Sequence, residues 1–184
     1  MADYIRNIDH LPEYCYNGNK ISGIQYTVIT DLVEEPISID FFKAHAKIDF
    51  NTDDALIAEY IKAARQELEQ WSQLSFGVKT ITLTAVSLPR YYKLMYGPVA
   101  SITGTDYTLI GDIIKEGGED VEIEFTTKPM DNSAIKIAVA KYAAGLYAVR
   151  ENIIINEAGN PVNGESFIDL AKRMLLPFRN VILI

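Results

Sequence analysis

The sequence predicts an α+β protein that is mainly helical, an antiparallel bundle of about four helices with an antiparallel β-meander inserted between the second and third helices. Apolar residues recur every three or four positions over 53–74 and again over 131–151, which is typical of two long helices. Between them, residues 78–86 alternate polar and apolar side chains, the period of a half-buried strand. A chain of 184 residues can also bury a sizeable core.

The region before the first long helix contains weaker signals. Residues 1–24 are polar and aromatic with a turn signal at 17–19, so we expect an N-terminal arm outside the core. Residues 25–32 are rich in β-branched side chains and could form a strand that ends before Pro36. Ser38 stands where an N-cap belongs, at the start of a short helix over about 39–47.

The helix over 53–74 has the strongest pattern in the chain. Asn51 or Thr52 can cap its free N–H groups, and Asp53 and Asp54 favour the positive end of its dipole. One face carries an apolar stripe made of Ile57, Ile61, Ala64, Leu68 and Trp71. The opposite, polar face is expected to hold Lys62, Arg65, Glu67 and Glu69. The sequence therefore predicts a two-faced helix of about six turns.

The remaining elements follow in order. A β insertion over about 78–128 contains bends at 97–98 and 104 and a turn at 117–118. The helix over 131–151 has its cap among residues 131–133, an apolar stripe that includes Tyr142 and Leu146, and small residues that allow close approach of a neighbour. A last helix over 166–176 is stopped by proline and leads to a tail at 177–184. We therefore expect an arm at 1–24 and a single domain at 25–184.

Composition and charge exclude several classes of protein. With 48% hydrophobic and 23% charged residues the chain is ordinary for a globular protein. No apolar run approaches the roughly 20 residues of a membrane span, and no secretory signal pattern is visible, so we expect synthesis in the host cytoplasm and no membrane partner. The net charge of −8 and the scattered basic residues argue against sequence-independent binding of nucleic acid. A single cysteine excludes an internal disulfide.

The residue patterns of catalysis and metal binding are missing. The sequence contains no G-x-S-x-G elbow and no phosphate-binding P-loop. Cys15, His10 and His45 are too few for a structural zinc site. His10 and Cys15 could be drawn as a base and thiolate, but a surface histidine and a small buried hydrophobe are favoured. Asp53 and Asp54 could be drawn as an acid–base pair, but helix capping explains both. We therefore predict no catalytic residue, no cofactor and no metal.

The C-terminal segment 181–184 is unusual because it consists of four consecutive aliphatic residues. Exposed aliphatic side chains at a chain end favour aggregation unless they extend a sheet or fill a groove. Two interpretations stay open. The tail could fold back onto the chain's own sheet, or it could form an interface with another subunit.

The order of these segments resembles the head–tail connector, or adaptor, proteins of tailed bacteriophages. Residues 36–73 are similar to the family's opening Ser-containing helix and its following "dDalI..lI.aAr..vE" helix. Residues 97–102 match its "P...v.sI" turn, residues 135–152 its "ik.Ail.lva.lYenRe" helix, and residues 175–179 its "lL.pyR" close. Phe178 replaces the usual tyrosine, and neither the arm nor the last four residues has a counterpart.

This resemblance implies a structural virion protein without enzymatic activity. Such proteins form a ring of about twelve copies beneath the portal, join the DNA-filled head to the tail and line the DNA exit channel. The implied partners are the portal protein, neighbouring copies, the next tail-side connector or tail protein, and passing DNA without specific binding. We expect contacts with the portal or a neighbouring subunit from Pro177, Phe178, Arg179, Val181, Ile182, Leu183 and Ile184. We expect packing between helices or between subunits from Ile57, Ile61, Ala64, Leu68, Trp71, Tyr142 and Leu146.

Two alternatives from other classes remain. One is a small cytoplasmic enzyme or ligand-binding domain with a cleft between helices and sheet, which would need titratable residues converging on His45. The other is a host regulatory or interaction module. A small ligand without ring formation would favour the first, and a chain that stays monomeric with every virion protein would favour the second.

Overall fold

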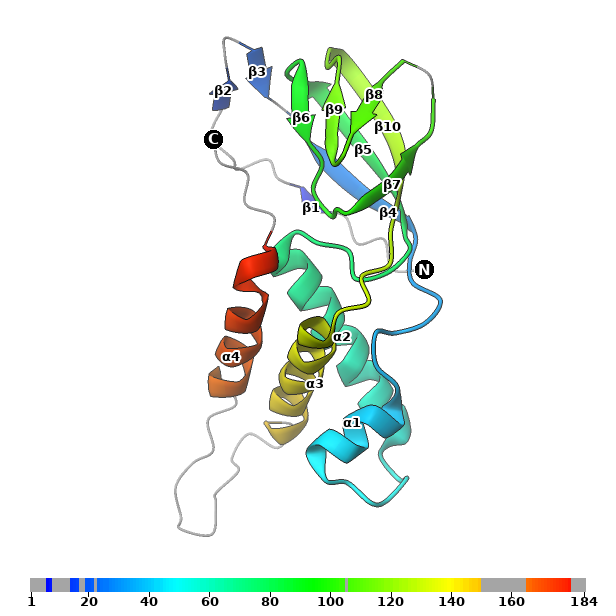
Figure 1. The fold of residues 1–184 in the computed structure, drawn as a ribbon, viewed down its shortest axis with the longest axis vertical. Coiled ribbons are helices and arrows are strands. Elements are labelled where there is room, and N and C mark those ends of the chain that lie inside the picture. The colour runs from blue at the N-terminus through cyan, green and yellow to red at the C-terminus, as the bar shows by residue number, and fades with distance from the viewer. Residues whose placement is uncertain are drawn as a thin grey trace. The chain divides into compact units, whose positions relative to one another are not determined.

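The computed structural model describes residues 23–104, 106–149 and 165–179, together with three short N-terminal strand segments. The chain divides into two compact units (Figure 1). The β unit comprises the strands before Glu34 together with Gln73–Pro129. The helical unit comprises Glu34–Ser72 and Met130–Arg179. Each unit is therefore built from segments that are far apart in the sequence.

The helical unit contains four α-helices and a short 3₁₀ turn in the part of the chain that is described. The elements are α1 (Ile39–Ala46), α2 (Asp54–Ser72), α3 (Ser133–Ala148), α4 (Glu165–Leu175) and η1 (Leu176–Phe178). Figure 1 shows α3 between α4 and α1, and α2 contacts both α3 and α4. Because α3 has neighbours on both sides, its small residues Ala138, Ala140 and Ala143 are fully buried.

Side-chain caps fix the beginnings of two helices. The Ser38 hydroxyl accepts a hydrogen bond from the Phe41 N–H at 3.1 Å at the start of α1. At the start of α3, the Asn132 side chain accepts from the Ala134 N–H at 2.8 Å. Each cap satisfies an N–H group that has no partner within its helix. Within the described residues, no helix is both long enough and apolar enough to span a membrane.

The β unit contains three antiparallel sheets among its described strands. The largest has the order β1-β4-β5-β10-β7, the second has the order β6-β9-β8, and the third is the hairpin β2-β3. The bounds in the first sheet are Arg6–Asn7, Gln25–Thr30, Thr80–Ser87, Glu119–Thr127 and Val99–Ile102. Those in the second are Tyr91–Lys93, Ile113–Lys115 and Thr108–Ile110, and those of the hairpin are Tyr14–Tyr16 and Asn19–Ile21.

The expectation of a mainly helical bundle with one inserted meander is wrong. The four helices are present, but strand β4 precedes them in the chain and pairs with β5 after α2, with Tyr26 opposite Leu83 and Val28 opposite Ile81. Strand β10 lies between β5 and β7, so the strands do not follow one another in meander order. The physical reason is that strand pairing is long-range. The pattern of residues 25–32 indicates a strand but carries no information about its partner.

The core of the β unit lies between the five-stranded and three-stranded sheets. Alternate residues of β5 and β10, such as Ile81, Leu83 and Phe125, are buried and pack with Tyr92 and Ile114 of the second sheet. The intervening side chains are polar and pair across the strands, for example Thr82 with Glu124 and Thr84 with Glu122. One face of the sheet is therefore apolar and the other polar, as the period of two requires.

A pair of buried tyrosines connects the two sheets. The Tyr26 and Tyr92 hydroxyl groups lie 3.1 Å apart, and the Met95 N–H donates to the Tyr26 hydroxyl at 3.1 Å. Burial raises the pKa of Tyr26 well above its usual value and also raises the pKa of Tyr92. Both phenols therefore stay protonated in the folded protein at a pH where the unfolded chain ionises.

We expect the β unit to lose stability as the pH rises above about 10, where tyrosines of the unfolded chain begin to ionise. The unfolded state binds fewer protons than the folded state in this range, so the stability is complete below pH 10 and falls as the pH rises. Absorbance at 295 nm and far-UV circular dichroism, followed together during an alkaline titration, would measure this. Tyr92→Phe should make the loss of stability with rising pH less steep. Tyr91→Phe removes a half-exposed phenol and should leave this pH dependence unchanged. Ionisation of every tyrosine with the native spectrum intact would contradict the prediction.

Candidate assembly interface

The residues expected to pack between helices or subunits are mostly inside the helical unit. Buried positions are Ile57, Ile61, Ala64, Leu68 and Tyr142. Trp71 and Leu146 are half-buried. Fully buried side chains of this kind pack against helices of their own chain. A contact of Trp71 or Leu146 with a neighbouring subunit stays a prediction.

The described part of the C-terminal tail is held against helix α2. Pro177 and Arg179 are exposed and Phe178 is half-buried at the end of η1. The Arg179 guanidinium lies 4.8 Å from the centroid of the Trp71 ring, within the range of a cation–π interaction. This contact joins the residue after η1 to α2. Val181, Ile182, Leu183 and Ile184 lie outside the described residues.

The two aspartates at the start of α2 connect three helices. The Asp53 carboxylate accepts a hydrogen bond from the Tyr147 hydroxyl of α3 at 2.6 Å. Asp54 forms an ion pair with Lys43 of α1 at 2.9 Å, and Lys43 also donates to the Asn51 side chain. Each carboxylate therefore has a partner on another helix. The sequence explained the pair by helix capping, and these contacts with other helices add a structural role that it did not indicate.

The sequence pattern predicts that Arg65 lies on the polar face of α2. In the structure, its guanidinium instead lies in a buried ion network. Arg65 is fully buried; its Nε and Nη2 groups donate to the two Glu35 carboxylate oxygens at 2.9 and 3.0 Å. Its Nη1 group donates to Glu69 at 3.1 Å, and Glu69 is itself buried. The spacing of four residues between Arg65 and Glu69 was an available signal. Glu35 is 30 positions away, and nothing local indicates that contact.

His45 is the residue on which the alternative interpretation as an enzyme or ligand-binding domain depends. Partial burial lowers the pKa of this exposed histidine, and the positive charge of Lys141 lowers it further. His45 is therefore neutral near pH 7. Over residues 23–104, 106–149 and 165–179, no group of three His, Cys, Asp or Glu side chains is placed to hold a metal ion. Cys15 lies in β2, where only the backbone is described, and His10 lies outside the described residues.

The order of elements and the sequence together identify the family. The family of phage gp6-like head-tail connector proteins matches residues 36–166, which is more than half of the chain. The chain belongs to this family. The resemblance seen in the sequence is thereby confirmed, and the protein is a structural head–tail connector of a virus particle. No curated protein matches the sequence of this connector.

Solved structures share the fold of the connector. A chain in the virion of a native gene transfer agent particle has a TM-score of 0.64 at 18% identity, covering 86% of this chain and 97% of that chain. A chain in the neck of an empty gene transfer agent particle, computed with C6 symmetry, has the same TM-score at 16% identity and the same coverage. A chain in the neck of the native particle, computed with C12 symmetry, has a TM-score of 0.55 at 18% identity, covering 85% and 97%. The fold of this chain therefore covers nearly the whole length of each of those three chains.

Proposed function

We propose that about twelve copies of this connector form a ring beneath the portal, joining the head to the tail and lining the DNA exit channel. The observation that carries the proposal is the family match over residues 36–166. A further support is the shared fold with a neck protein whose particle was computed with C12 symmetry. The partners proposed with it are the portal protein, neighbouring copies, and the next tail-side connector or tail protein.

The charge of the chain supports a channel through which DNA passes without binding. At −8 per chain, a ring of twelve would carry on the order of −96 charges, and these would repel the phosphate backbone. Exposed Glu122 and Glu124 add acidic groups to the polar face of β10. A ring of this charge would let DNA slide rather than adhere.

We also propose that the C-terminal tail contacts the portal or the neighbouring subunit. The tail comprises Pro177, Phe178, Arg179 and the aliphatic residues 181–184. Exposed Pro177 and Arg179 stand where another protein can reach them, and the guanidinium carries directed donors for carboxylates or carbonyls. Val181, Ile182, Leu183 and Ile184 would supply the apolar part of the contact.

Deleting residues 177–184 is expected to leave a folded chain that no longer assembles on the portal. The reason is that the deletion removes exposed contact groups and the apolar end but leaves α1 to α4 intact. The measurement is to mix the purified chain with its portal, followed by negative-stain imaging and mass determination. The wild-type chain should add a coaxial ring. A chain with Val181, Ile182, Leu183 and Ile184 replaced by serines tests the aliphatic part alone. A normal ring from the truncated chain would exclude the tail from portal binding.

A further inference from the structure

Helix α4 carries more apolar surface than its own unit covers. Ala171 and Leu175 are fully buried against the rest of the helical unit. Phe167, Leu170 and Leu176, in contrast, are 37%, 44% and 55% exposed. Phe167 and Leu170 lie one helical turn apart and so form a continuous strip. We call Phe167 and Leu170, together with Leu176 of the following η1 turn, the α4 face.

The charges beside the α4 face are mainly positive. Lys172 and Arg173 lie in the last turn of α4, and Arg179 follows η1. The two carboxylates of α4, Glu165 and Asp169, lie in its N-terminal half, so the positive charge gathers at its C-terminal end. A partner for this face should therefore combine apolar side chains with carboxylates.

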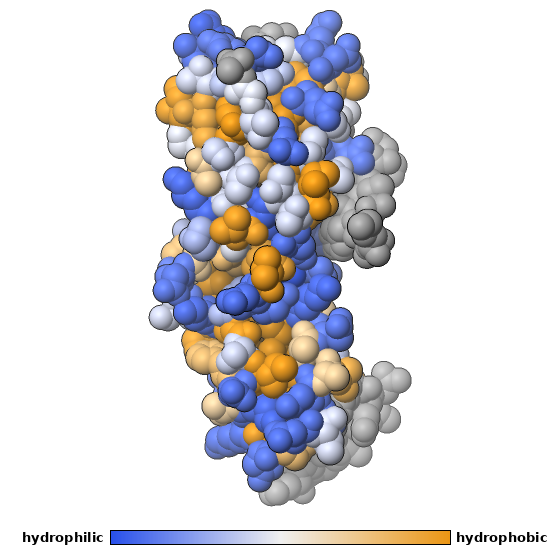
Figure 2. Space-filling view, turned by 90° about the vertical axis from the view of Figure 1, so that its right-hand side faces the viewer, coloured by the Kyte–Doolittle hydropathy of each residue, from blue (hydrophilic) through white to orange (hydrophobic). Residues whose placement is uncertain are grey.

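A second apolar patch occurs where α1 and α2 meet. Phe41 of α1, Phe50 of the connecting loop and Leu56 of the first turn of α2 are 39%, 44% and 43% exposed. We call these three residues the α1–α2 face. Figure 2 views the side of the helical unit where α1 and the start of α2 lie. On this side, apolar surface is bordered by hydrophilic surface.

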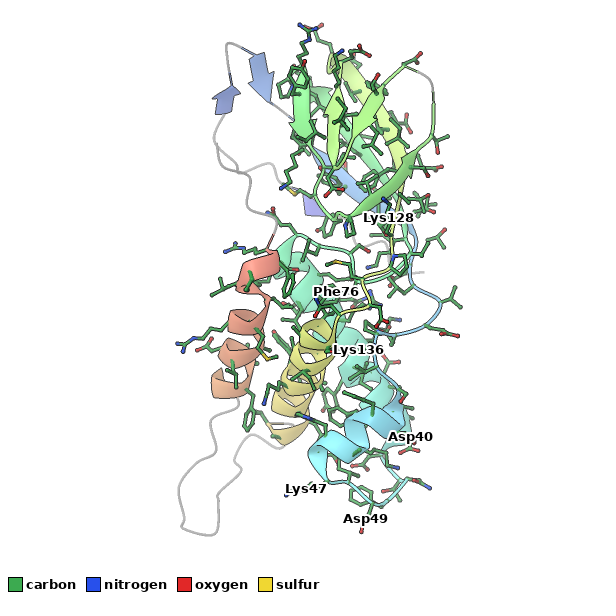
Figure 3. The ribbon with its side chains drawn as sticks, in the orientation of Figure 1. Asp40, Lys47, Asp49, Phe76, Lys128 and Lys136 are labelled. Atoms are coloured by element: carbon green, nitrogen blue, oxygen red, sulfur yellow. The ribbon has the colours of Figure 1, made fainter. Side chains whose placement is uncertain are left out.

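The charges around the α1–α2 face are mainly negative. Between positions 40 and 59 the sequence has five carboxylates and two lysines. Asp40 and Asp49 are exposed and extend outward at this end of the unit, where Lys47 also lies (Figure 3). Lys43, the other lysine, is occupied by Asp54. The charge pattern is therefore opposite to that of the α4 face.

Helices α4 and α1, which carry parts of the two faces, lie on opposite sides of α3 within one compact unit (Figure 1). A ring needs a heterologous contact, in which one patch of each copy meets a different patch of the next copy. A single self-complementary patch would close a dimer instead. Two different apolar faces with opposite charge patterns, one on α4 and one where α1 and α2 meet, satisfy this requirement.

We propose that the α4 face of one copy packs against the α1–α2 face of the next copy in the connector ring. This inference rests on the proposed ring and specifies its subunit contact. Large apolar side chains would form the centre of the contact. The surrounding basic and acidic groups would determine which face of one copy meets which face of the next.

The direct test is chemical cross-linking of rings assembled on the portal. Cys15 is the only cysteine, so Cys15→Ser provides a background without thiols. In this background, Leu56→Cys and Leu170→Cys are combined in one chain and treated with a short bismaleimide. A ladder of covalent oligomers is expected from the double variant, and no oligomer from either single variant. Dimers from Leu170→Cys alone would show that the α4 face meets itself, and would overturn the proposal.

A second measurement uses substitutions at exposed positions that leave the core intact. Leu170→Asp and Leu56→Asp should each reduce incorporation into portal-bound rings at least tenfold. Ile110→Asp, at a position 56% exposed in the β unit, is the matched control and should assemble normally. Intact rings from Leu170→Asp would overturn the proposed contact but not the ring itself. The same result is expected if the chain's own tail, rather than the next copy, covers α4. Failure of the wild-type chain to form any ring would instead reject the proposed function.

Discussion

Replacing Arg65 by methionine is expected to lower the free energy of unfolding by about 3–5 kcal/mol, the usual cost of leaving a buried charge without its partner. Arg65 is fully buried and neutralises Glu69, which is 2% exposed. Methionine can fill much of the arginine stem but cannot pair with either carboxylate. The loss should exceed that of any surface ion pair in this chain because water cannot replace the missing guanidinium.

Urea unfolding followed by the fluorescence of Trp71 measures this effect, since Trp71 is the only tryptophan and lies in α2. Lys62→Met, at an exposed position of the same helix, is the matched control and should change the stability by less than about 0.5 kcal/mol. Adding Glu69→Leu to Arg65→Met should recover part of the loss, because it removes the unpaired carboxylate. Equal stability of Arg65→Met and Lys62→Met would show that the network contributes nothing.

Replacing Phe125 by alanine is expected to cost about 3–5 kcal/mol through the cavity that it leaves. Phe125 is fully buried in β10, opposite Ile81 on one side and Ile102 on the other. Its ring meets the Tyr26 ring edge-on with centroids 6.3 Å apart. The substitution therefore removes both packing area and an aromatic contact at the centre of the β unit.

Urea unfolding of the Phe125→Ala variant followed by far-UV circular dichroism tests this prediction. Tyr91→Ala removes an aromatic ring of similar size that is 51% exposed, and should cost less than about 1 kcal/mol. A similar loss for both variants would mean that burial between the two sheets does not determine the stability of the β unit.

The sequence determined the elements whose signals are local. The helix expected over 53–74 is found at Asp54–Ser72, and the helix expected over 39–47 at Ile39–Ala46 with Ser38 as its cap. Helical periodicity and capping depend on residues three or four positions apart, so a single segment contains the information. The order of such segments was also sufficient for the resemblance to head–tail connectors, which the family match confirms.

Only the tertiary structure decided which segments meet. Three features join residues that are distant in sequence. They are the pairing of β4 with β5, the burial of Arg65 between Glu35 and Glu69, and the hydroxyl pair of Tyr26 and Tyr92. The charge of Arg65 indicated a solvent-facing position, yet a carboxylate from the segment before α1 allows it to be buried. Pairing of this kind depends on where the whole chain brings each segment, and no local pattern of side chains encodes that position.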